Sequence, residues 1–320
     1  MGGKTFSIYC NAKLTDSAAA ILKAGVGAHR LLMGQQPKLN LLGGAPDPLM
    51  DQADIVFGQP DVTQALKLPN LKWIHLTTAG YTRYDTSEFA AAMRQRSGTM
   101  TNSSSVYDEP CAEHALAFML CAARRIGQNA PTQWNYQPMR SGSRLLVGQT
   151  ALLVGFGAIA RRLAEMLAPM RMNLIGLRRN PRGDEPIAMR RISQIDELLP
   201  QADHVMNILP ASSETNLFFD ANRFAKMKTG CVFYNIGRGS TVDQGALRQA
   251  LESGHLSAAW IDVTTPEPLP ADDPLWKTKN CFITPHTAGG FDDEFPALVR
   301  HFLGNLQRYE RGEPLMDRVY

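Results

Sequence analysis

Thr150-Ala-Leu-Leu-Val-Gly-Phe-Gly-Ala-Ile-Ala160 is the stretch of this 320-residue chain that decides its fold. The apolar run at its start predicts a buried strand, and the residues that follow it continue as a helix. Gly155 permits a sharp turn between the two, Gly157 lets the backbone approach a pyrophosphate, and Ala160 keeps the helix close to the strand. With a second strand predicted at Asn173–Leu177, the pattern is a βαβ unit of the size that binds dinucleotides.

The turn in this unit is suited to phosphate groups. The N-terminus of the helix presents free N–H groups and the positive end of the helix dipole to an anion. A strand–turn–helix without a ligand is the alternative, and the clear strand and helix on either side count against it. The residues that we expect to contact a dinucleotide here are Gly155, Phe156, Gly157, Ala158 and Ile159.

Arginines at the end of the second strand favour NADP(H) over NAD(H). An NAD site usually has an acidic residue at this place, which binds the ribose hydroxyls. This chain has Arg178-Arg179-Asn180 instead, with no carboxylate before Asp184. Arginine here suits a 2′-phosphate. The alternative is that both arginines are solvated surface charges.

Short strands and helices alternate along the rest of the chain. Among the first hundred residues, strand candidates such as Asp54–Phe57 and Leu71–Leu76 favour a parallel sheet covered by helices. Thr101–Ser105 is polar and turn-rich, and we interpret it as a crossing between domains. A long helix is predicted from Pro110 to Arg125. The sequence therefore predicts an α/β protein with two domains.

The composition argues against several other classes of protein. Thirty-three basic and 30 acidic residues give a net charge of +3, which makes no case for nucleic-acid binding. The five cysteines are scattered without ligand spacing, so we expect neither a disulfide framework nor a metal site. No window approaches the roughly 18 apolar residues of a membrane helix, and the first residues lack a signal-peptide pattern. We therefore expect a cytoplasmic protein that binds no membrane.

Polar side chains suited to carbonyl chemistry occur in three stretches downstream of the turn. They are Arg238, Glu267 and His286. Arginine can grip a carboxylate with two parallel hydrogen bonds, and imidazole can exchange a proton near neutral pH. A carboxylate beside the imidazole would favour its protonated form. Together with the dinucleotide turn, this set suggests reduction of a 2-keto acid; for each residue, the alternative is a surface or loop side chain without a catalytic role.

The chain resembles the D-isomer-specific 2-hydroxyacid dehydrogenases over nearly its whole length. The resemblance is carried by GFGAIA, NILPASSET, NIGRGSTVDQGAL, AAWIDVTTPEPLP and TPHTAGG, which occur in the family's order and spacing. AEHAL at Ala112–Leu116 is similar to the family's linker helix. Asn207-Ile-Leu-Pro210 and the double arginine make the chain most similar to the glyoxylate/hydroxypyruvate reductase branch.

This resemblance implies a fold, a reaction and a partner. The fold would be a Rossmann dinucleotide-binding domain, residues 102–288, inserted into a flavodoxin-like substrate domain of residues 1–101 and 289–320. The reaction would be NAD(P)H-dependent reduction of a small 2-keto acid, of the glyoxylate or hydroxypyruvate type, to the D-2-hydroxy acid. The partner would be a second copy of the chain in a homodimer. Trp134 and Arg140–Arg144 are candidates to approach the active site of that second copy.

The resemblance also implies roles for matching residues. Arg238 would bind the substrate carboxylate and polarise the keto oxygen, His286 would donate the proton, and Glu267 would hold the imidazole. Asp262 would contact the nicotinamide carboxamide. The other binding residues implied are Ala79 and Gly80, whose backbone would bind the substrate carboxylate, and Leu209, Pro210 and Ile236, which would line the nicotinamide pocket.

Alternatives to this function stay open. One is a dinucleotide-sensing, corepressor-like binding protein on the same fold. Another is a dehydrogenase for bulkier 2-keto acids. The chain also departs from the family at Thr82-Arg83, where Asp-Asn or Asp-His often follows the tyrosine, which leaves the contacts of the substrate loop open.

Overall fold

The computed structural model describes residues 5–38, 42–127 and 142–320, and the chain divides into two units. Unit 1 comprises residues 1–107 and 291–320, and unit 2 comprises residues 108–290, so unit 2 interrupts the sequence of unit 1. Both are α/β units with parallel sheets, which confirms the predicted fold class. Trp134 and Arg140 lie outside the described residues. Within the described ranges, no helix is long and apolar enough to cross a membrane.

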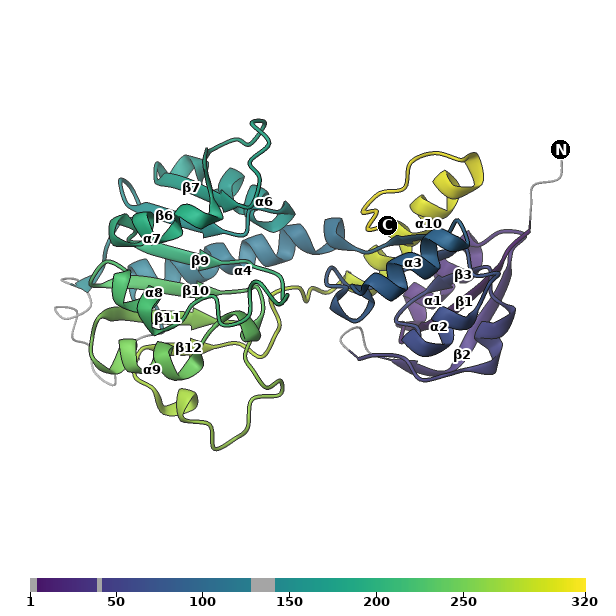
Figure 1. Ribbon diagram of the computed structural model, residues 1–320, viewed down its shortest axis with the longest axis horizontal. Coiled ribbons are helices and arrows are strands. Elements are labelled where there is room, and N and C mark those ends of the chain that lie inside the picture. Colours follow the sequence, from purple (N-terminus) through teal and green to yellow (C-terminus); the bar gives the residue numbers. More distant parts are fainter. Residues whose placement is uncertain (1–4, 39–41, 128–141) are drawn as a thin grey trace. The chain divides into compact units, whose positions relative to one another are not determined.

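The described residues of unit 1 form a five-stranded parallel sheet in the order β2-β1-β3-β4-β5 (Figure 1). This is the strand order of flavodoxin-like folds. The strands are β1 (Ser7–Ala12), β2 (Arg30–Lys38), β3 (Ile55–Phe57), β4 (Trp73–His75) and β5 (Thr99–Thr101). The helices are α1 (Asp16–Gly25), α2 (Val62–Lys67), α3 (Ser87–Gln95) and α10 (Glu294–Arg311), with short 3-10 helices η1 (Pro48–Gln52) and η2 (Thr82–Tyr84).

Helix α10 completes the core of unit 1, although about 190 residues separate it in sequence from β5 (294 − 101 = 193). Leu298, Phe302 and Leu306 recur at helical spacing and give the helix its buried face. The Phe302 ring stacks on Phe57 and Trp73, with ring centroids 4.5 and 5.3 Å apart. Figure 1 shows α10, in yellow, among the purple and blue elements of unit 1.

The last residues of the chain cover the edge strand β5. Arg318 forms an antiparallel bridge with Thr101, and the Val319 N–H donates to the Met100 carbonyl at 2.8 Å. Just before this bridge, Asp317 accepts hydrogen bonds from the N–H and the hydroxyl of Ser105 at 2.8 and 2.7 Å. Ser105 lies in the first turn of α4 (Ser104–Arg124), so a residue of the tail caps this helix.

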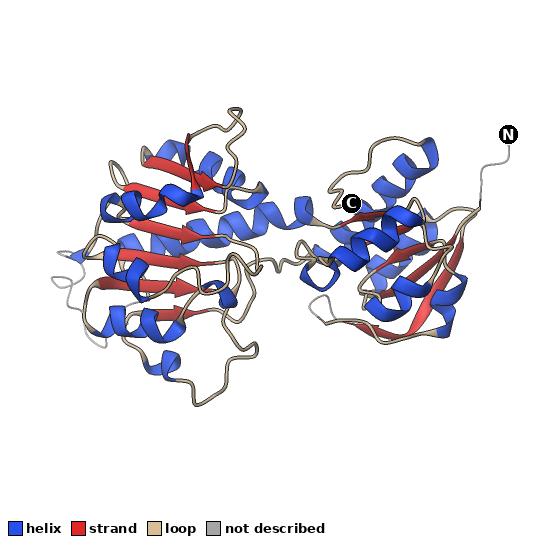
Figure 2. Cartoon of the chain, in the orientation of Figure 1, coloured by secondary structure: helices blue, strands red, loops and turns tan. Residues whose placement is uncertain are grey.

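The described part of unit 2 forms a seven-stranded parallel sheet in the order β12-β11-β10-β9-β6-β7-β8 (Figure 2). The chain winds from β6 outward to β8 and then returns to β9, so the topological switch point lies between β6 and β9. The strands are β6 (Thr150–Val154), β7 (Asn173–Arg178), β8 (Ala188–Arg191), β9 (His204–Asn207), β10 (Cys231–Asn235), β11 (Leu256–Ile261) and β12 (Cys281–Ile283). The helices besides α4 are α6 (Ala158–Leu167), α7 (Ile195–Leu198), α8 (Ala221–Lys226) and α9 (Gln244–Glu252), with 3-10 helices η3 (Ala168–Met170), η4 (Ile192–Gln194), η5 (Leu199–Gln201), η6 (Gly239–Thr241) and η7 (Pro274–Lys277).

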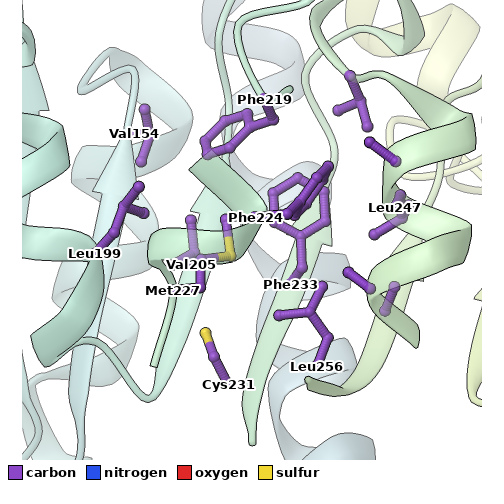
Figure 3. Close-up of a cluster of buried hydrophobic side chains, with 14 of the residues drawn as sticks. Val154, Leu199, Val205, Phe219, Phe224, Met227, Cys231, Phe233, Leu247 and Leu256 are labelled. Atoms are coloured by element: carbon purple, nitrogen blue, oxygen red, sulfur yellow. The ribbon is translucent and has the colours of Figure 1, made fainter. Parts of the chain in front are cut away.

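Apolar side chains cover both faces of this sheet, as expected for parallel strands that are packed between helices. On one face, residues such as Val154, Val205 and Phe233 pack against α7, α8 and α9; Figure 3 shows this cluster. On the other face, residues such as Leu153 and Tyr234 pack against α4 and α6. Alternate residues of a strand face opposite sides of the sheet, and both sets are buried. Polar residues lie where the strands end.

The structure differs from the sequence prediction at the start of α4. Pro110 is expected at the first turn because proline is favoured there, but the helix begins six residues earlier, at Ser104. Residues Thr101–Ser105, predicted to be a polar, turn-rich crossing between domains, end β5 and begin α4. The caps from Asn102, whose Oδ1 accepts from the Ser104 N–H at 3.2 Å, and from Asp317 explain the extra turns. Strands β2, β5 and β8 have no counterpart among the predicted elements.

Replacing Phe302 with alanine should lower the free energy of unfolding by about 3–5 kcal/mol, because it empties a stacked aromatic site in a closed core. Denaturant unfolding monitored by circular dichroism would measure the loss. Gln307→Ala, on the exposed side of the same helix, is the matched control and should change stability by less than about 0.5 kcal/mol. If both variants unfold like the unsubstituted protein, α10 does not stabilise the core of unit 1.

Candidate active site

The candidate residues of unit 2 lie at one edge of its sheet. Each follows, or ends, one of the parallel strands, and the carboxyl ends of parallel strands share an edge. The residues and their strands are Gly155 after β6, Arg178 at the end of β7, Leu209 and Pro210 after β9, Ile236 and Arg238 after β10, Asp262 and Glu267 after β11, and His286 after β12. The topology therefore gathers residues that are up to 131 positions apart in the sequence (286 − 155 = 131).

The two glycines of the turn after β6 have different structural requirements. Gly155 has φ +97°, and a Cβ there would lie 2.8 Å from the Ile208 carbonyl oxygen, so the turn itself needs glycine. Gly157 precedes α6 and has nothing within 4 Å of a Cβ position. Among the described residues, no side chain caps α6. Open space and free helix N–H groups at this place fit a bound pyrophosphate.

Three of the apolar residues near the turn are buried in the core. Phe156 is 4% exposed, and its ring approaches Gly176 of β7 so closely that a Cβ there would lie 2.7 Å from it. Leu209 and Ile236 are buried as well. Ala158 is exposed at the start of α6, and Ile159 is half-buried.

Two buried asparagines, Asn207 and Asn235, hold the loops that follow β9 and β10. They are partners in the sheet register, and the Asn207 amide donates to Asn235 Oδ1 at 3.0 Å and to Thr241 Oγ1 at 2.7 Å. Asn207 Oδ1 accepts from the Leu209 N–H at 3.2 Å. The Thr241 hydroxyl donates to the Arg238 carbonyl at 2.6 Å. Side chains that are inaccessible to solvent thus fix the backbone of Arg238.

The paired arginines after β7 have different environments. Arg178 bonds to Glu185 at 3.2 Å, and that carboxylate, whose side chain is 1% exposed, also accepts from the N–H groups of Arg182 and Gly183 at 2.8 Å. The Arg182 N–H, the Gly183 N–H and Arg178 hold the pKa of Glu185 at about 2. Arg179 is 71% exposed and pairs with the exposed Glu214. Arg178 therefore folds its own loop, whereas Arg179 projects into solvent.

His286 and Glu267 form a direct pair. His286 Nδ1 lies 2.7 Å from Glu267 Oε2, and Glu267 Oε1 accepts from the Thr264 N–H at 3.0 Å. A carboxylate can only accept a hydrogen bond, so Nδ1 carries a proton and Nε2 is the ring atom left for acid–base chemistry. The imidazole is 26% exposed, so Nε2 can reach a small molecule.

Glu267 also couples the pair electrostatically to Arg238. Burial alone would raise the pKa of the Glu267 carboxyl group, but the hydrogen bonds from His286 and Thr264 and the charge of Arg238 hold it below its ordinary value. Burial lowers the pKa of the Arg238 guanidinium, which Glu267 opposes. The structure thus brings Arg238, Glu267 and His286 together, with the carboxylate ionised at neutral pH.

Comparisons with known proteins show the family of the chain. Residues 116–288 match the family model described as "D-isomer specific 2-hydroxyacid dehydrogenase, NAD binding domain". The chain belongs to the D-isomer specific 2-hydroxyacid dehydrogenase family. It is 36% identical to the glyoxylate/hydroxypyruvate reductase B of Citrobacter koseri over 230 residues, which cover 69% of each chain. It is 30% identical over 292 residues to an uncharacterized protein in the proB 3′ region of Corynebacterium melassecola, covering 87% of this chain and 92% of that one.

A solved structure extends the similarity over both units. A D-isomer specific 2-hydroxyacid dehydrogenase family protein from Aeromonas salmonicida superposes with a TM-score of 0.79. The alignment covers 99% of each chain at 26% identity. The two-domain, Rossmann-type fold of the dehydrogenase family is therefore the fold of this chain.

Asp262 anchors the turn that carries His286 in this family member. Its Oδ1 accepts from the Thr287 N–H at 2.8 Å, its Oδ2 accepts from the Ala288 N–H at 3.0 Å, and its carbonyl accepts from the His286 N–H at 2.8 Å. His286 has φ +54°, a conformation that non-glycine residues rarely adopt without support. The sequence predicted a cofactor contact for Asp262, and the structure adds this local role.

Sequence reasoning missed His114 and Thr284. His114 is one of several histidines with no assigned role in the sequence, yet its Nε2 lies 3.1 Å from Thr284 Oγ1. Thr284 in turn lies 2.6 Å from Asp262. A polar residue directly after a parallel strand, at the edge where ligands bind, is the signal that points to Thr284. For His114 no local signal exists, because the contact spans 170 residues.

Ala79 and Gly80 lie in unit 1, in the loop after β4. Their carbonyls accept hydrogen bonds from Asn102 Nδ2 and from the Thr78 hydroxyl, both at 2.6 Å. Within residues 5–38, 42–127 and 142–320, the N–H of neither residue donates a hydrogen bond. Adjacent N–H groups without partners are suited to a carboxylate, and the assigned role in substrate binding stays a prediction.

The two glycines of the turn should respond differently to alanine. Gly155→Ala places a side chain at positive φ against the Ile208 carbonyl and should lower stability by about 1–3 kcal/mol. Gly157→Ala should change stability by less than about 0.5 kcal/mol, but weaken dinucleotide binding at least about tenfold, because its methyl group fills the space open to the pyrophosphate. Urea unfolding and calorimetric titration with NADPH and NADH would separate the two effects. Unchanged binding by Gly157→Ala would place the pyrophosphate elsewhere.

Proposed function

We propose that this protein reduces a small 2-keto acid, of the glyoxylate or hydroxypyruvate type, to the D-2-hydroxy acid, with NADPH preferred over NADH. The observation that carries the proposal is the His286–Glu267 pair beside Arg238 at the dinucleotide edge of the sheet. An intact acid–base pair favours an enzyme over a dinucleotide-sensing protein on the same fold. The similarity to a glyoxylate/hydroxypyruvate reductase B supports the substrate class.

The residues of the chain supply charge, orientation and a proton. Arg238 binds the carboxylate of the substrate and turns a guanidinium N–H toward the keto oxygen, where negative charge develops. The His286 imidazolium donates its Nε2 proton to that oxygen, which becomes the hydroxyl group of the product. Glu267 stabilises the imidazolium before transfer and keeps Nδ1 protonated afterwards. A bound reduced nicotinamide would supply the hydride that reaches the carbonyl carbon.

Binding of the dinucleotide would use the residues at the turn and the neighbouring strand ends. The backbone of Gly155–Ile159 would hold the pyrophosphate at the start of α6. Arg179 would bind the 2′-phosphate, because it is exposed and its present partner is an exposed carboxylate. The Asp262 Oδ2 atom, which accepts one hydrogen bond, has a lone pair left for the nicotinamide carboxamide. Leu209, Pro210 and Ile236 would line the nicotinamide pocket.

A homodimer and a cytoplasmic location complete the proposal. The homodimer follows from the family resemblance, and its test is the mass of the purified protein by light scattering. A mass of one chain across the micromolar range would contradict it.

His286→Gln should lower kcat by about 10²–10⁴-fold while dinucleotide binding is retained, because the amide cannot donate a proton to the product. Steady-state oxidation of NADPH with glyoxylate and with hydroxypyruvate would measure the loss. If the unsubstituted protein binds NADPH but oxidises it with no 2-keto acid, the proposed reaction is wrong.

Glu267→Gln should change the pH dependence of the reaction. The depressed pKa of Glu267 means that its carboxylate is charged throughout the neutral range, so its loss destabilises the imidazolium at every such pH. The alkaline limb of the kcat/KM profile should therefore move to lower pH, with a larger loss of activity at pH 8 than at pH 6. Glu252→Gln on α9, an exposed carboxylate paired with Arg248, is the control and should leave the profile in place.

Arg179→Ala should weaken NADPH binding about 10- to 100-fold, the loss expected for charge-assisted hydrogen bonds, and should hardly affect NADH. Arg178→Ala should instead weaken both dinucleotides, because it releases Glu185 and the loop that this carboxylate orders. Calorimetric titration of both variants with both dinucleotides would show the difference, with Arg248→Ala on α9 as a control. Equal losses of NADPH and NADH binding in Arg179→Ala would mean that Arg179 does not bind the 2′-phosphate.

A further inference from the structure

We propose that His114 and Thr284 are positioning residues for the proton donor, which act through Asp262 on the turn that carries His286. The inference rests on the proposed function for the role of His286, but the chain of contacts is independent of it. None of the candidate catalytic residues Arg238, Glu267 and His286 is part of this chain.

The turn that carries His286 needs support from another residue. His286 has φ +54°, and residues 286–288 direct three N–H groups toward Asp262. The Asp262 side chain is 2% exposed, so water does not compete for its oxygens. Any rotation of this carboxylate would release the Thr287 and Ala288 N–H groups and let the imidazole move. The orientation of the Asp262 carboxylate therefore fixes the backbone of the turn that carries His286, whose ring is held by Glu267.

Thr284 fixes the orientation of the Asp262 carboxylate. Its hydroxyl lies 2.6 Å from Asp262 Oδ1, the oxygen that also accepts from the Thr287 N–H at 2.8 Å. An ionised carboxylate can only accept, so Thr284 donates its single proton to Asp262. Thr284 comes directly after β12, whose pairing with β11 holds its backbone: the Thr284 N–H donates to the Ile261 carbonyl at 3.0 Å. The hydroxyl thus ties the carboxylate to the rigid end of the sheet.

The contact with Thr284 determines which nitrogen of His114 carries the proton. Because the Thr284 proton is used on Asp262, Thr284 Oγ1 can only accept from His114, whose Nε2 at 3.1 Å must therefore carry a proton. The His114 ring packs edge-on against Phe118, with centroids 4.4 Å apart, which fixes its plane. Burial lowers the pKa of His114, an effect that Asp262 opposes, so the ring is neutral with its proton on Nε2. Helix α4 therefore contributes a hydrogen-bond donor to the support of the His286 turn.

The test removes the hydrogen bonds of Thr284 and His114 with side chains of similar size. Thr284→Val and His114→Leu should each lower kcat about 10- to 100-fold, as expected when a catalytic group is displaced, with the dissociation constant for NADPH within about threefold of the unsubstituted protein. Thr284→Ser restores the hydroxyl and His114→Gln restores an N–H donor, and both should recover kcat to within about threefold. Equal losses in Thr284→Val and Thr284→Ser would show that packing rather than hydrogen bonding matters, and would overturn the proposal.

A second measurement does not depend on turnover or on the stability of a variant. Nitrogen-15 NMR of the unsubstituted protein, with histidine labelled in the ring, reports which nitrogen of His114 is protonated. The Nε2–H tautomer is expected at neutral pH, and the Nδ1–H tautomer would overturn the chain of contacts. If the protein reduces no 2-keto acid but shows the Nε2–H tautomer, the proposed function fails and the contact chain stands, so the two failures are distinguishable.

Discussion

Parallel pairing of the strands in unit 2 is the constraint on which the rest of the site depends. It places the end of every strand at one edge, and it buries both faces of the strands, so polar residues at this edge are surrounded by protein. Asn207 and Asn235 are register partners, and Asp262 follows Ile261, the partner of Asn235 on β11. Buried polar side chains thus lie at, or directly after, the ends of three neighbouring strands. Each ties down the loop that follows, because a buried polar group that lacks a partner is unfavourable.

Three carboxylates fix loops at this edge of the sheet through hydrogen bonds. Asp262 holds the His286 turn, Glu267 orients the imidazole, and Glu185 folds the loop that presents Arg179. All three accept hydrogen bonds from backbone N–H groups, which fix a loop whatever its side chains are. The charges that would meet a substrate or a dinucleotide therefore lie on loops whose shape is set by other charges. Substitutions at the carboxylates should alter geometry, whereas substitutions at Arg179 should alter affinity alone.

The sequence predicted the elements whose signals are local. The strand at Thr150–Val154, the glycine turn and the helix after it need no distant partner, and the structure has them there. The pairing of Glu267 with His286 was predicted from the family pattern. What could not be predicted depends on contacts between distant residues. The start of α4 needs Asp317, the contact of His114 needs Thr284, and the edge strand β8, AMRR, has too few apolar residues to be recognised without β7 beside it.

The tail that covers β5 has a consequence for handling the protein. An edge strand offers unpaired N–H and C=O groups to any other extended chain. Here the Val319 N–H bonds to the Met100 carbonyl, and the Asp317 carbonyl accepts from the Asn102 N–H. Deleting the last four residues would expose this edge and also free the first turn of α4 from Asp317. Self-association through added strands would then compete with the native sheet. Four residues thus close the edge of one sheet and the start of one helix at the same time.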